Sequence, residues 1–465
     1  MFDIVILGGT IIEPKLEIQT VANIGVKNGK ITAITREKIE GKEVINAANK
    51  IVCPGFVDIH SHLSHDLYSA WLSAKQGITT CLSGNCGMTA KMPIKDYLDE
   101  IESTGYPINF ATLVGHSFKL REMVGLTDPY ASADARQIAE MARLAEEALE
   151  QGAFGISLGL EYAPGAAEAE CMTLAELAAK YDKLVPIHVR SDALDFARAL
   201  KEAIVLMEKT GARVHISHFA YQFGVYPEVT EMAIVMVSNA IKKGLPLLCD
   251  SGMYEAFATF VNSSVFDHGW TEQYNCQLGD LMISSGKYVG QPCTEEIYEY
   301  IRANEPDTVG TAFVGVLPDL GLALKQPFMM VSTDAGLGDG PGSGHPQNAG
   351  TYPRVFQKLV REQGVLSMME AVVKSTYMPA KQMGINGAKG FIGVGADADI
   401  VVFNPKTIKD NADYVGLGSP DAQPTGVEYV IVNGVTIVSE EKALEDKLPG
   451  KVLRQPNKPW QMEER

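Results

Sequence analysis

Short apolar runs alternate with longer amphipathic stretches through the central part of the chain. Eight of these runs have the length and the apolar, β-branched composition of strands. They read "FVDIHSH", "ITTCLSGN", "INFATLVGH", "AFGISLGL", "LVPIHVR", "ARVHISHF", "LPLLCDSG" and "FMMVSTDAG". The clearest helical stretch, "SADARQIAEMARLAEEALEQG", places charged residues opposite Ala, Leu and Met, and we expect Gly152 to end it. This alternation predicts an α/β protein with a parallel (β/α)₈ barrel of the TIM type.

Both ends of the chain show a different pattern, in which short β-type segments are separated by Gly-, Asn- and Lys-rich turns. "NGKITAI" near the start is echoed by "NGVTIVS" near the end. We therefore predict one small β-sandwich domain from residues 1–54 and 390–465, with the barrel at 55–389. The stretch 256–325 interrupts the alternation, so we expect an irregular insertion or lid there.

Composition narrows the class of protein. With 46% hydrophobic and 21% charged residues the chain has the material for a large core. Forty basic and 57 acidic residues give a net charge of −17, which argues against nucleic acid or an anionic membrane as a partner. Seven scattered cysteines indicate reduced thiols, and no apolar run reaches transmembrane length. We expect a cytoplasmic enzyme with a small-molecule substrate, and homo-oligomer formation stays open.

Polar residues gather where the proposed strands end. The carboxyl ends of barrel strands form the catalytic face, so these residues are expected to meet. Imidazole, thiolate and carboxylate are the ligands that zinc prefers, and an additional role as general base falls to the carboxylate. The candidate metal ligands are His60, His62, Cys86, His188, His218 and Asp334. Each has an ordinary structural explanation alone, such as a hydrogen-bonded histidine or a turn cap, but their joint placement favours a metal site.

Several motifs resemble one known family. "GGTIIEP", "CPGFVDIHSH" and "GFIGVGADADIVVF" resemble the amidohydrolase superfamily over almost the whole chain. "SGNCG", "GISLGLEYAPG" and "STDAG" followed by "HPQNAGTYPRVF" resemble its D-aminoacylase branch, the N-acyl-D-amino-acid deacylases. The resemblance implies a zinc-dependent hydrolase of a non-peptide C–N bond, with an N-acyl-D-amino acid or a related N-acyl amine as substrate.

The resemblance also implies roles for the candidate residues. Cys86, His188 and His218 would hold one zinc tightly. His60, His62 and Asp334 would form a second, weaker site, and Asp334 would be the catalytic acid and base. Residues 151–165 contain no lysine, so the carboxylated lysine of hydantoinase-like relatives has no counterpart there. His65 and His215 have no family role and are expected to be structural.

Departures from the family pattern concern the substrate. Phe219 and Ala220 stand where a histidine and a lysine usually follow the sixth strand, and Gln347 stands where an arginine is usual. We list Arg190, Tyr254, His345 and Gln347 as candidate substrate-binding residues, and Arg121 and Arg354 are expected to be structural. Loss of the carboxylate anchors leaves open a cyclic-amide hydrolase of the hydantoinase or dihydroorotase kind. A metal-free scaffold is the remaining alternative.

Overall fold

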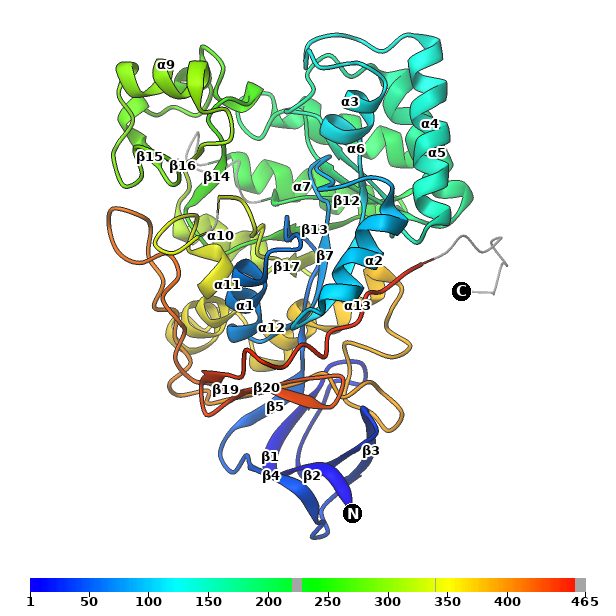
Figure 1. The fold of residues 1–465 in the computed structure, drawn as a ribbon, viewed down its shortest axis with the longest axis vertical. Coiled ribbons are helices and arrows are strands. Elements are labelled where there is room, and N and C mark those ends of the chain that lie inside the picture. The colour runs from blue at the N-terminus through cyan, green and yellow to red at the C-terminus, as the bar shows by residue number, and fades with distance from the viewer. Residues whose placement is uncertain (220–227, 339, 456–465) are drawn as a thin grey trace.

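A sheet built from both chain ends lies at one end of the molecule (Figure 1). The computed structural model describes residues 1–219, 228–338 and 340–455. Within them, nine strands form this sheet in the order β21-β20-β19-β18-β5-β1-β2-β3, and β4 also pairs with β1. The strands are β1 (Phe2–Glu13), β2 (Ile18–Lys27), β3 (Lys30–Thr35), β4 (Gly41–Asn46), β5 (Ile51–Pro54), β18 (Ile400–Phe403), β19 (Val427–Val432), β20 (Val435–Ser439) and β21 (Lys442–Ala443). The two ends meet where β18 pairs antiparallel with β5, so the expected shared terminal unit is present as a sheet.

All eight predicted central strands are present. They are β6 (Phe56–Asp58), β7 (Ile78–Ser83), β8 (Asn109–Thr112) continued by β9 (Val114–Gly115), β10 (Ile156–Gly159), β11 (Leu184–His188), β12 (Arg213–Ile216), β13 (Leu248–Ser251) and β17 (Met329–Val331). They form two parallel sheets, β6-β7-β8 and β9-β10-β11-β12-β13-β17. A parallel bridge between Ser61 and Ala335 joins the segments that follow β6 and β17. The carboxyl ends of the first and last strands are therefore neighbours.

Helices separate most of these strands, and three more within the described residues follow the last of them, β17. They are α1 (Leu67–Lys75), α2 (Ile94–Thr104), α3 (Arg121–Met123), α4 (Ala135–Glu150), α5 (Glu168–Lys180), α6 (Phe196–Thr210), α7 (Val229–Lys242), α11 (Gln347–Val355), α12 (Met368–Ser375) and α13 (Tyr377–Met383). The predicted α4 begins at a capping box of Asp134 and Gln137, and Gly152 follows its end with a positive φ of 114°. No helix in the described part of the chain is long and apolar enough to cross a membrane.

The stretch 256–325 has regular structure, so the irregular character that we expected there is wrong, whereas its role as an inserted lid stays a prediction. It contains β14 (Ala256–Phe260), α8 (Trp270–Gln273), β15 (Leu281–Ile283), α9 (Glu295–Asn304), β16 (Val309–Phe313) and α10 (Leu317–Leu324). The three strands form an antiparallel sheet in the order β14-β16-β15. Buried Phe257, Phe266, Trp270 and Tyr274 give it an apolar core that Cys86 also joins. These aromatic side chains stabilise the insertion because they bury large apolar areas.

Candidate metal centre

The six predicted ligands come together at the carboxyl ends of the parallel strands. His60 and His62 follow β6, Cys86 follows β7, and His188 is the last residue of β11. His218 follows β12, and Asp334 follows β17. All six side chains are buried. Strand ends from distant parts of the sequence therefore deliver one polar cluster into a largely apolar interior.

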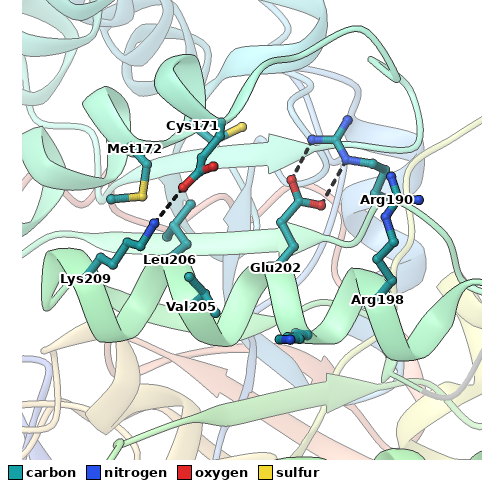
Figure 2. Close-up of a pocket in the computed structure, with 10 residues that line it drawn as sticks. Cys171, Met172, Arg190, Arg198, Glu202, Val205, Leu206 and Lys209 are labelled. Atoms are coloured by element: carbon teal, nitrogen blue, oxygen red, sulfur yellow. Dashed lines mark hydrogen bonds and ion pairs between the residues drawn. The ribbon is translucent and has the colours of Figure 1, made fainter.

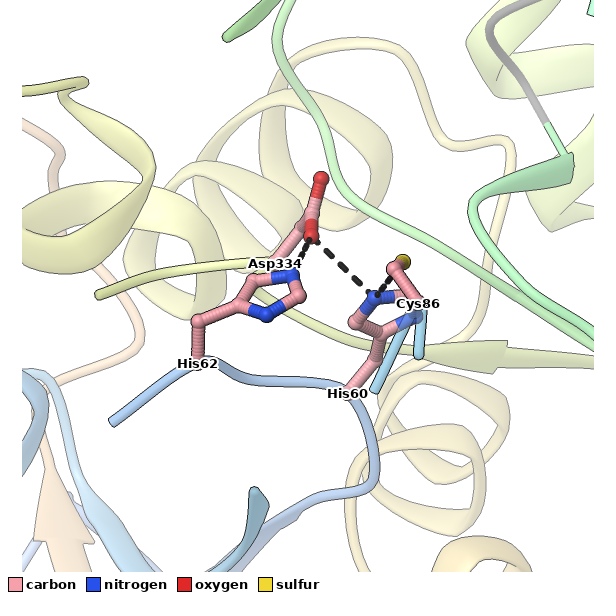
Figure 3. Close-up of side chains that lie close together, drawn as sticks. All are labelled: His60, His62, Cys86 and Asp334. Atoms are coloured by element: carbon pink, nitrogen blue, oxygen red, sulfur yellow. Dashed lines mark hydrogen bonds and ion pairs between the residues drawn. The ribbon is translucent and has the colours of Figure 1, made fainter. Parts of the chain in front are cut away.

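One group of these residues surrounds the Asp334 carboxylate (Figure 3). Asp334 Oδ1 lies 3.1 Å from His60 Nε2 and 3.0 Å from His62 Nε2. Cys86 Sγ lies 3.3 Å from His60 Nε2. Potential ligand atoms of these four residues all lie within 4.8 Å of one another. The two histidines that are two apart in sequence thus point to one carboxylate.

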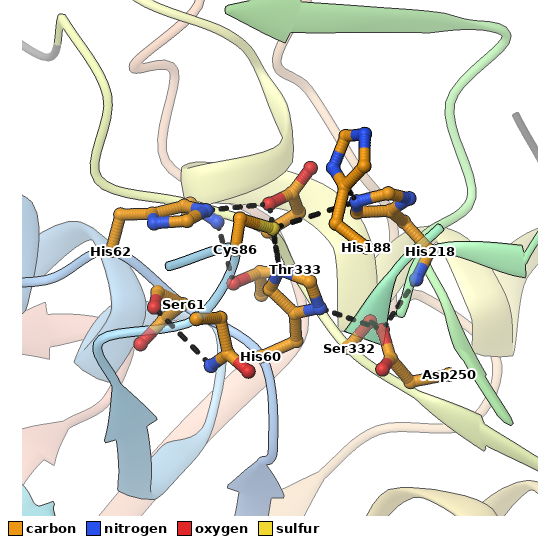
Figure 4. Close-up of polar contacts among 12 residues, drawn as sticks. His60, Ser61, His62, Cys86, His188, His218, Asp250, Ser332 and Thr333 are labelled. Atoms are coloured by element: carbon orange, nitrogen blue, oxygen red, sulfur yellow. Dashed lines mark hydrogen bonds and ion pairs between the residues drawn. The ribbon is translucent and has the colours of Figure 1, made fainter. Parts of the chain in front are cut away.

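A second group lies on the other side of the same thiol (Figure 4). Cys86 Sγ lies 3.5 Å from His218 Nε2, and His218 Nε2 lies 2.7 Å from His188 Nδ1. These three side chains form a separate potential ligand set. Cys86 is therefore common to two adjacent groups of donor atoms.

Three of the six residues have unusual backbone conformations. Cys86, His218 and Asp334 have positive φ angles of 52°, 35° and 60°. Residues other than glycine avoid this left-handed region, and exceptions concentrate at functional sites. In this protein the strained residues are the ones that turn the chain at strand ends, and this turn directs their side chains into the cluster.

The charges of the cluster stabilise one another. Burial raises the pKa of Cys86, but His60 and His218 outweigh it and hold the pKa well below its usual value. Burial likewise raises the pKa of Asp334, and His60 and His62 lower it well below the ordinary range. Burial lowers the pKa of His60, whereas Asp250, Cys86 and Asp334 raise it overall. The thiol and the carboxyl group are thus favoured as anions, the forms that bind cations.

These residues fit a zinc ion by chemistry and by spacing. Zinc takes thiolate, imidazole and carboxylate ligands at about 2.0 to 2.3 Å in a tetrahedron, so two ligand atoms are about 3.3 to 3.8 Å apart. The distances from Cys86 Sγ to His60 Nε2 and His218 Nε2, 3.3 and 3.5 Å, are close to this spacing. The donor types therefore suit a metal in both groups, although the 2.7 Å between His218 Nε2 and His188 Nδ1 is shorter than the spacing of two ligands on one zinc ion.

Asp250 is an important residue of the centre that our sequence analysis did not select. Its Oδ1 accepts hydrogen bonds from Ser332 Oγ at 2.7 Å and from the His218 backbone N–H at 3.1 Å. The same oxygen lies 3.1 Å from His60 Nδ1, and Oδ2 lies 3.2 Å from His215 Nε2. Asp250 thus contacts the His60 nitrogen that faces away from Asp334. His215 contacts the other oxygen of Asp250 and so belongs to the same buried polar network. The sequence indicates such a role for Asp250, because it is an acidic residue within the apolar strand "LPLLCDSG".

The cavity at the centre is lined by candidate metal ligands, further carboxylates and mostly apolar side chains. Its described lining is His62, Cys86, Glu161, Tyr162, His188, Asp192, His218, Phe257, Ala258, Val265, Tyr274, Asp334 and Leu337. Four of these residues come from the 256–325 insertion, namely Phe257, Ala258, Val265 and Tyr274. Glu161 and Asp192 were not singled out from the sequence. The insertion therefore provides one wall of the cavity.

The four candidate substrate-binding residues are not among the described residues that line this cavity. Arg190 lies in a groove between α5 and α6, where it pairs with Glu202 (Figure 2). Tyr254 donates a hydrogen bond to Asp410 at 2.7 Å. His345 contacts the Ala256 carbonyl through Nε2 and accepts from the Gln347 backbone N–H at 3.1 Å. The Gln347 side-chain amide donates a hydrogen bond to the Asp334 backbone carbonyl. His345 and Gln347 together therefore support the loop that carries Asp334.

Arg121 and Arg354, which we expect to have structural roles, both form ion pairs with protein carboxylates. Arg121 Nη1 lies 2.7 Å from Glu170. Arg354 lies 2.9 Å from Glu255 and 3.4 Å from Asp410. Their charges are therefore balanced by protein carboxylates.

Comparison with known proteins assigns this arrangement to a family. The amidohydrolase family model matches residues 51–437. The chain belongs to the amidohydrolase family. This amidohydrolase is 28% identical to the N-acyl-D-glutamate deacylase of Alcaligenes xylosoxydans xylosoxydans, in an alignment that covers 97% of this chain and 96% of the relative.

Solved structures show the same similarity. A D-aminoacylase known for its binuclear metal centre superposes on the amidohydrolase with a TM-score of 0.86 at 26% identity, covering 98% of this chain and 100% of the other. The N-acyl-D-glutamate deacylase from Bordetella bronchiseptica, bound to zinc and a phosphonate inhibitor, gives 0.84 at 27% identity with the same coverage. The first of these neighbours has a binuclear metal centre, and the second was solved with zinc bound.

Proposed function

We propose that this amidohydrolase is a zinc-dependent deacylase that hydrolyses the C–N bond of an N-acyl-D-amino acid or a related N-acyl amine. The observation that carries the proposal is the position of Cys86, whose sulfur lies between the two groups of ligand atoms. Residues 151–165, which include β10, contain no lysine, so a bridging carboxylated lysine has no residue there. The deacylases described above support the same substrate class.

The ligand roles follow from the two groups. Cys86, His188 and His218 would hold one zinc tightly, and His60, His62 and Asp334 would form a weaker second site. When bound, zinc would activate a water molecule and polarise the acyl carbonyl. The thiolate would contribute negative charge, and Asp250 would hold His60 through Nδ1 so that its Nε2 faces the site.

Asp334 would transfer the proton. Its carboxylate would take a proton from the attacking water and pass it to the leaving nitrogen, so that the C–N bond breaks as the N–H bond forms. Gln347, through its hydrogen bond to the Asp334 carbonyl, would keep this carboxylate in place. The insertion would cover the cavity and exclude water from it.

We also propose how the chain divides into domains and in which compartment it works. The two parallel sheets would close as a (β/α)₈ barrel at 55–389, supported by the Ser61–Ala335 bridge. Residues 1–54 and 390–465 would form a separate β-sandwich domain. The seven cysteines all lie within the described residues and are free. Free thiols support a reducing compartment such as the cytoplasm.

The test measures bound zinc and turnover in Cys86→Ala and Asp334→Asn. We expect Cys86→Ala to lose zinc and activity together, whereas Asp334→Asn should keep the tightly bound zinc and lose at least about 100-fold in kcat, the typical contribution of general acid-base catalysis. Cys171→Ala is the matched control because Cys171 is a buried cysteine of α5 away from the centre. Full activity in either test variant contradicts the proposal.

A cyclic-amide hydrolase is the second candidate. It is favoured by the cavity lining, whose described residues include three carboxylates and neither lysine nor arginine. Such a lining offers no lysine or arginine for a charge-assisted hydrogen bond to a substrate carboxylate. Assays of N-acetyl-D- and N-acetyl-L-amino acids, N-acetyl amines and hydantoins under one condition separate the candidates.

A further inference from the structure

His188 is contacted on both ring nitrogens. Nδ1 lies 2.7 Å from His218 Nε2 and faces the group that includes Cys86. Nε2 lies 2.9 Å from Glu161 Oε2. A histidine that offers one nitrogen to a metal carries its proton on the other nitrogen, and the acceptor of that proton fixes the tautomer and the ring orientation. Glu161 is in the right place to be this acceptor.

Glu161 is the nearer of two acidic neighbours. Asp192 Oδ2 lies 3.7 Å from His188 Nε2, which is beyond hydrogen-bond distance, and 3.5 Å from His218 Nδ1. Glu161 itself is buried, with 6% of its surface exposed. Its contact with His188 is therefore the shorter one and is shielded from water, which strengthens it.

The insertion holds Glu161 in this position. Oε1, the oxygen that His188 does not use, lies 3.4 Å from Gln273 Nε2 and 3.3 Å from the Tyr274 hydroxyl. Ser264 Oγ donates a hydrogen bond of 2.6 Å to the backbone carbonyl of Glu161. These three residues all belong to the 256–325 insertion. The insertion thus contacts Glu161 through both its side chain and its backbone.

Tyr274 is itself held firmly. Its side chain is 2% exposed, and its ring lies 5.3 Å from that of Phe257 within the apolar core of the insertion. Gln273 and Tyr274 lie at the end of α8, directly beside exposed Glu272, whose carboxylate accepts a hydrogen bond from the hydroxyl of neighbouring Thr271. The core of the insertion therefore fixes the donors to Glu161, while Glu272 faces away from it.

We propose that Glu161 is a positioning residue of the metal centre. It holds His188 with Nδ1 turned toward Cys86 and His218, and Gln273 and Tyr274 of the insertion hold Glu161 in turn. The inference rests on the proposed use of Cys86, His188 and His218 as zinc ligands. It gives the insertion a second role beyond covering the cavity, because a change in the insertion alters the affinity for metal.

The experiment measures the zinc dissociation constant of metal-free protein by competition with a chromophoric chelator. We expect Glu161→Ala to weaken zinc binding by about 10- to 100-fold, the usual effect of losing the partner of a ligating histidine. Glu161→Gln should weaken binding less, because its amide oxygen still accepts from Nε2. Tyr274→Phe should shift affinity in the same direction by a smaller factor. Glu272→Gln is the matched control and should stay within about twofold of the wild type.

Cobalt substitution provides a second readout. The thiolate-to-cobalt absorption band reports Cys86 as a ligand, and we expect the Glu161 variants to keep this band at saturating cobalt. Zinc affinity of Glu161→Ala within twofold of the wild type overturns the proposal. Should Glu161→Ala unfold without metal, Glu161→Gln and Tyr274→Phe preserve side-chain volume and decide the question, and unchanged affinity in both overturns it.

The result separates this inference from the proposed deacylase function. Wild-type protein that binds zinc through Cys86 but hydrolyses no acyl amide contradicts the function and leaves the positioning role testable. Wild-type protein that hydrolyses acyl amides, with Glu161 variants of unchanged zinc affinity, contradicts the positioning role alone. Wild-type protein that binds no zinc contradicts both.

Discussion

Glu170 is the central acid of a buried network behind the third strand end, and its replacement by alanine should destabilise the protein strongly. Its Oε1 lies 2.7 Å from both His116 Nε2 and Arg121 Nη1. Glu170 and Arg121 are 0% and 1% exposed. The other oxygen, Oε2, accepts from the Ala167 backbone N–H at the start of α5. The network therefore joins this helix to the segment that follows β9.

The magnitude follows from the charge that the substitution leaves behind. Without Glu170, the partners that the buried Arg121 guanidinium retains among the described residues are the backbone carbonyls of Asp128 and Ala131. Removing one member of a buried ion pair costs about 3 to 5 kcal/mol, because the remaining charge stays buried without compensation. We expect this loss in the free energy of unfolding, measured by urea denaturation of zinc-saturated protein at pH 7.5.

The control for this prediction is Glu122→Ala. Glu122 forms an exposed pair with Lys119, and such pairs contribute about 0 to 1 kcal/mol.

The stabilisation by Glu170 also has a defined pH dependence. Burial raises the pKa of Glu170, but His116 and Arg121 outweigh it and lower the pKa below its usual value. Its stabilisation is thus present above the unfolded pKa of about 4.3 and is lost as the pH falls through the folded pKa. A Glu170→Ala loss no larger than that of Glu122→Ala refutes the reasoning.

Two further predictions concern other parts of the protein. Gly87 has a φ of 76°, and a Cβ there would lie 2.6 Å from the Ser117 backbone nitrogen. Gly87→Ala should therefore move the turn that carries Cys86 and weaken zinc binding at least about tenfold in the chelator assay. An unchanged zinc affinity contradicts this prediction. Burial lowers the pKa of Lys374 to about 8 in the folded protein, whereas the unfolded pKa of a lysine is about 10.4. Between these values the unfolded state holds more protons on Lys374 than the folded state, so this group makes the free energy of unfolding rise with pH. The free energy of unfolding of wild-type protein should therefore increase relative to Lys374→Met from pH 7.5 to pH 9.5, and a constant difference in urea denaturation contradicts the assignment.

The pattern of apolar runs was sufficient to locate the eight central strands, because each is buried and short and is bounded by turn residues. The pairing of His60 and His62 could also be predicted, since residues two apart on an extended chain share a face. The insertion was misread because its strands and aromatic core alternate with turns and do not follow the βα pattern. Glu161 lies within the motif "GISLGLEYAPG", but the sequence does not indicate its role, because its partners, His188, Gln273 and Tyr274, are distant in sequence.

The sequence by itself determined the central parallel strands, the β-type segments at both chain ends, their order, and the residues able to bind a metal, because these depend on local periodicity and side-chain chemistry. The tertiary structure decided which of these residues meet. It placed Cys86 between two histidine groups, kept Arg190 in an outer groove, and placed Asp250 and Glu161 beside the candidate ligands. Distances across parallel strands depend on the packing of the whole sheet, and no local stretch of sequence contains that information.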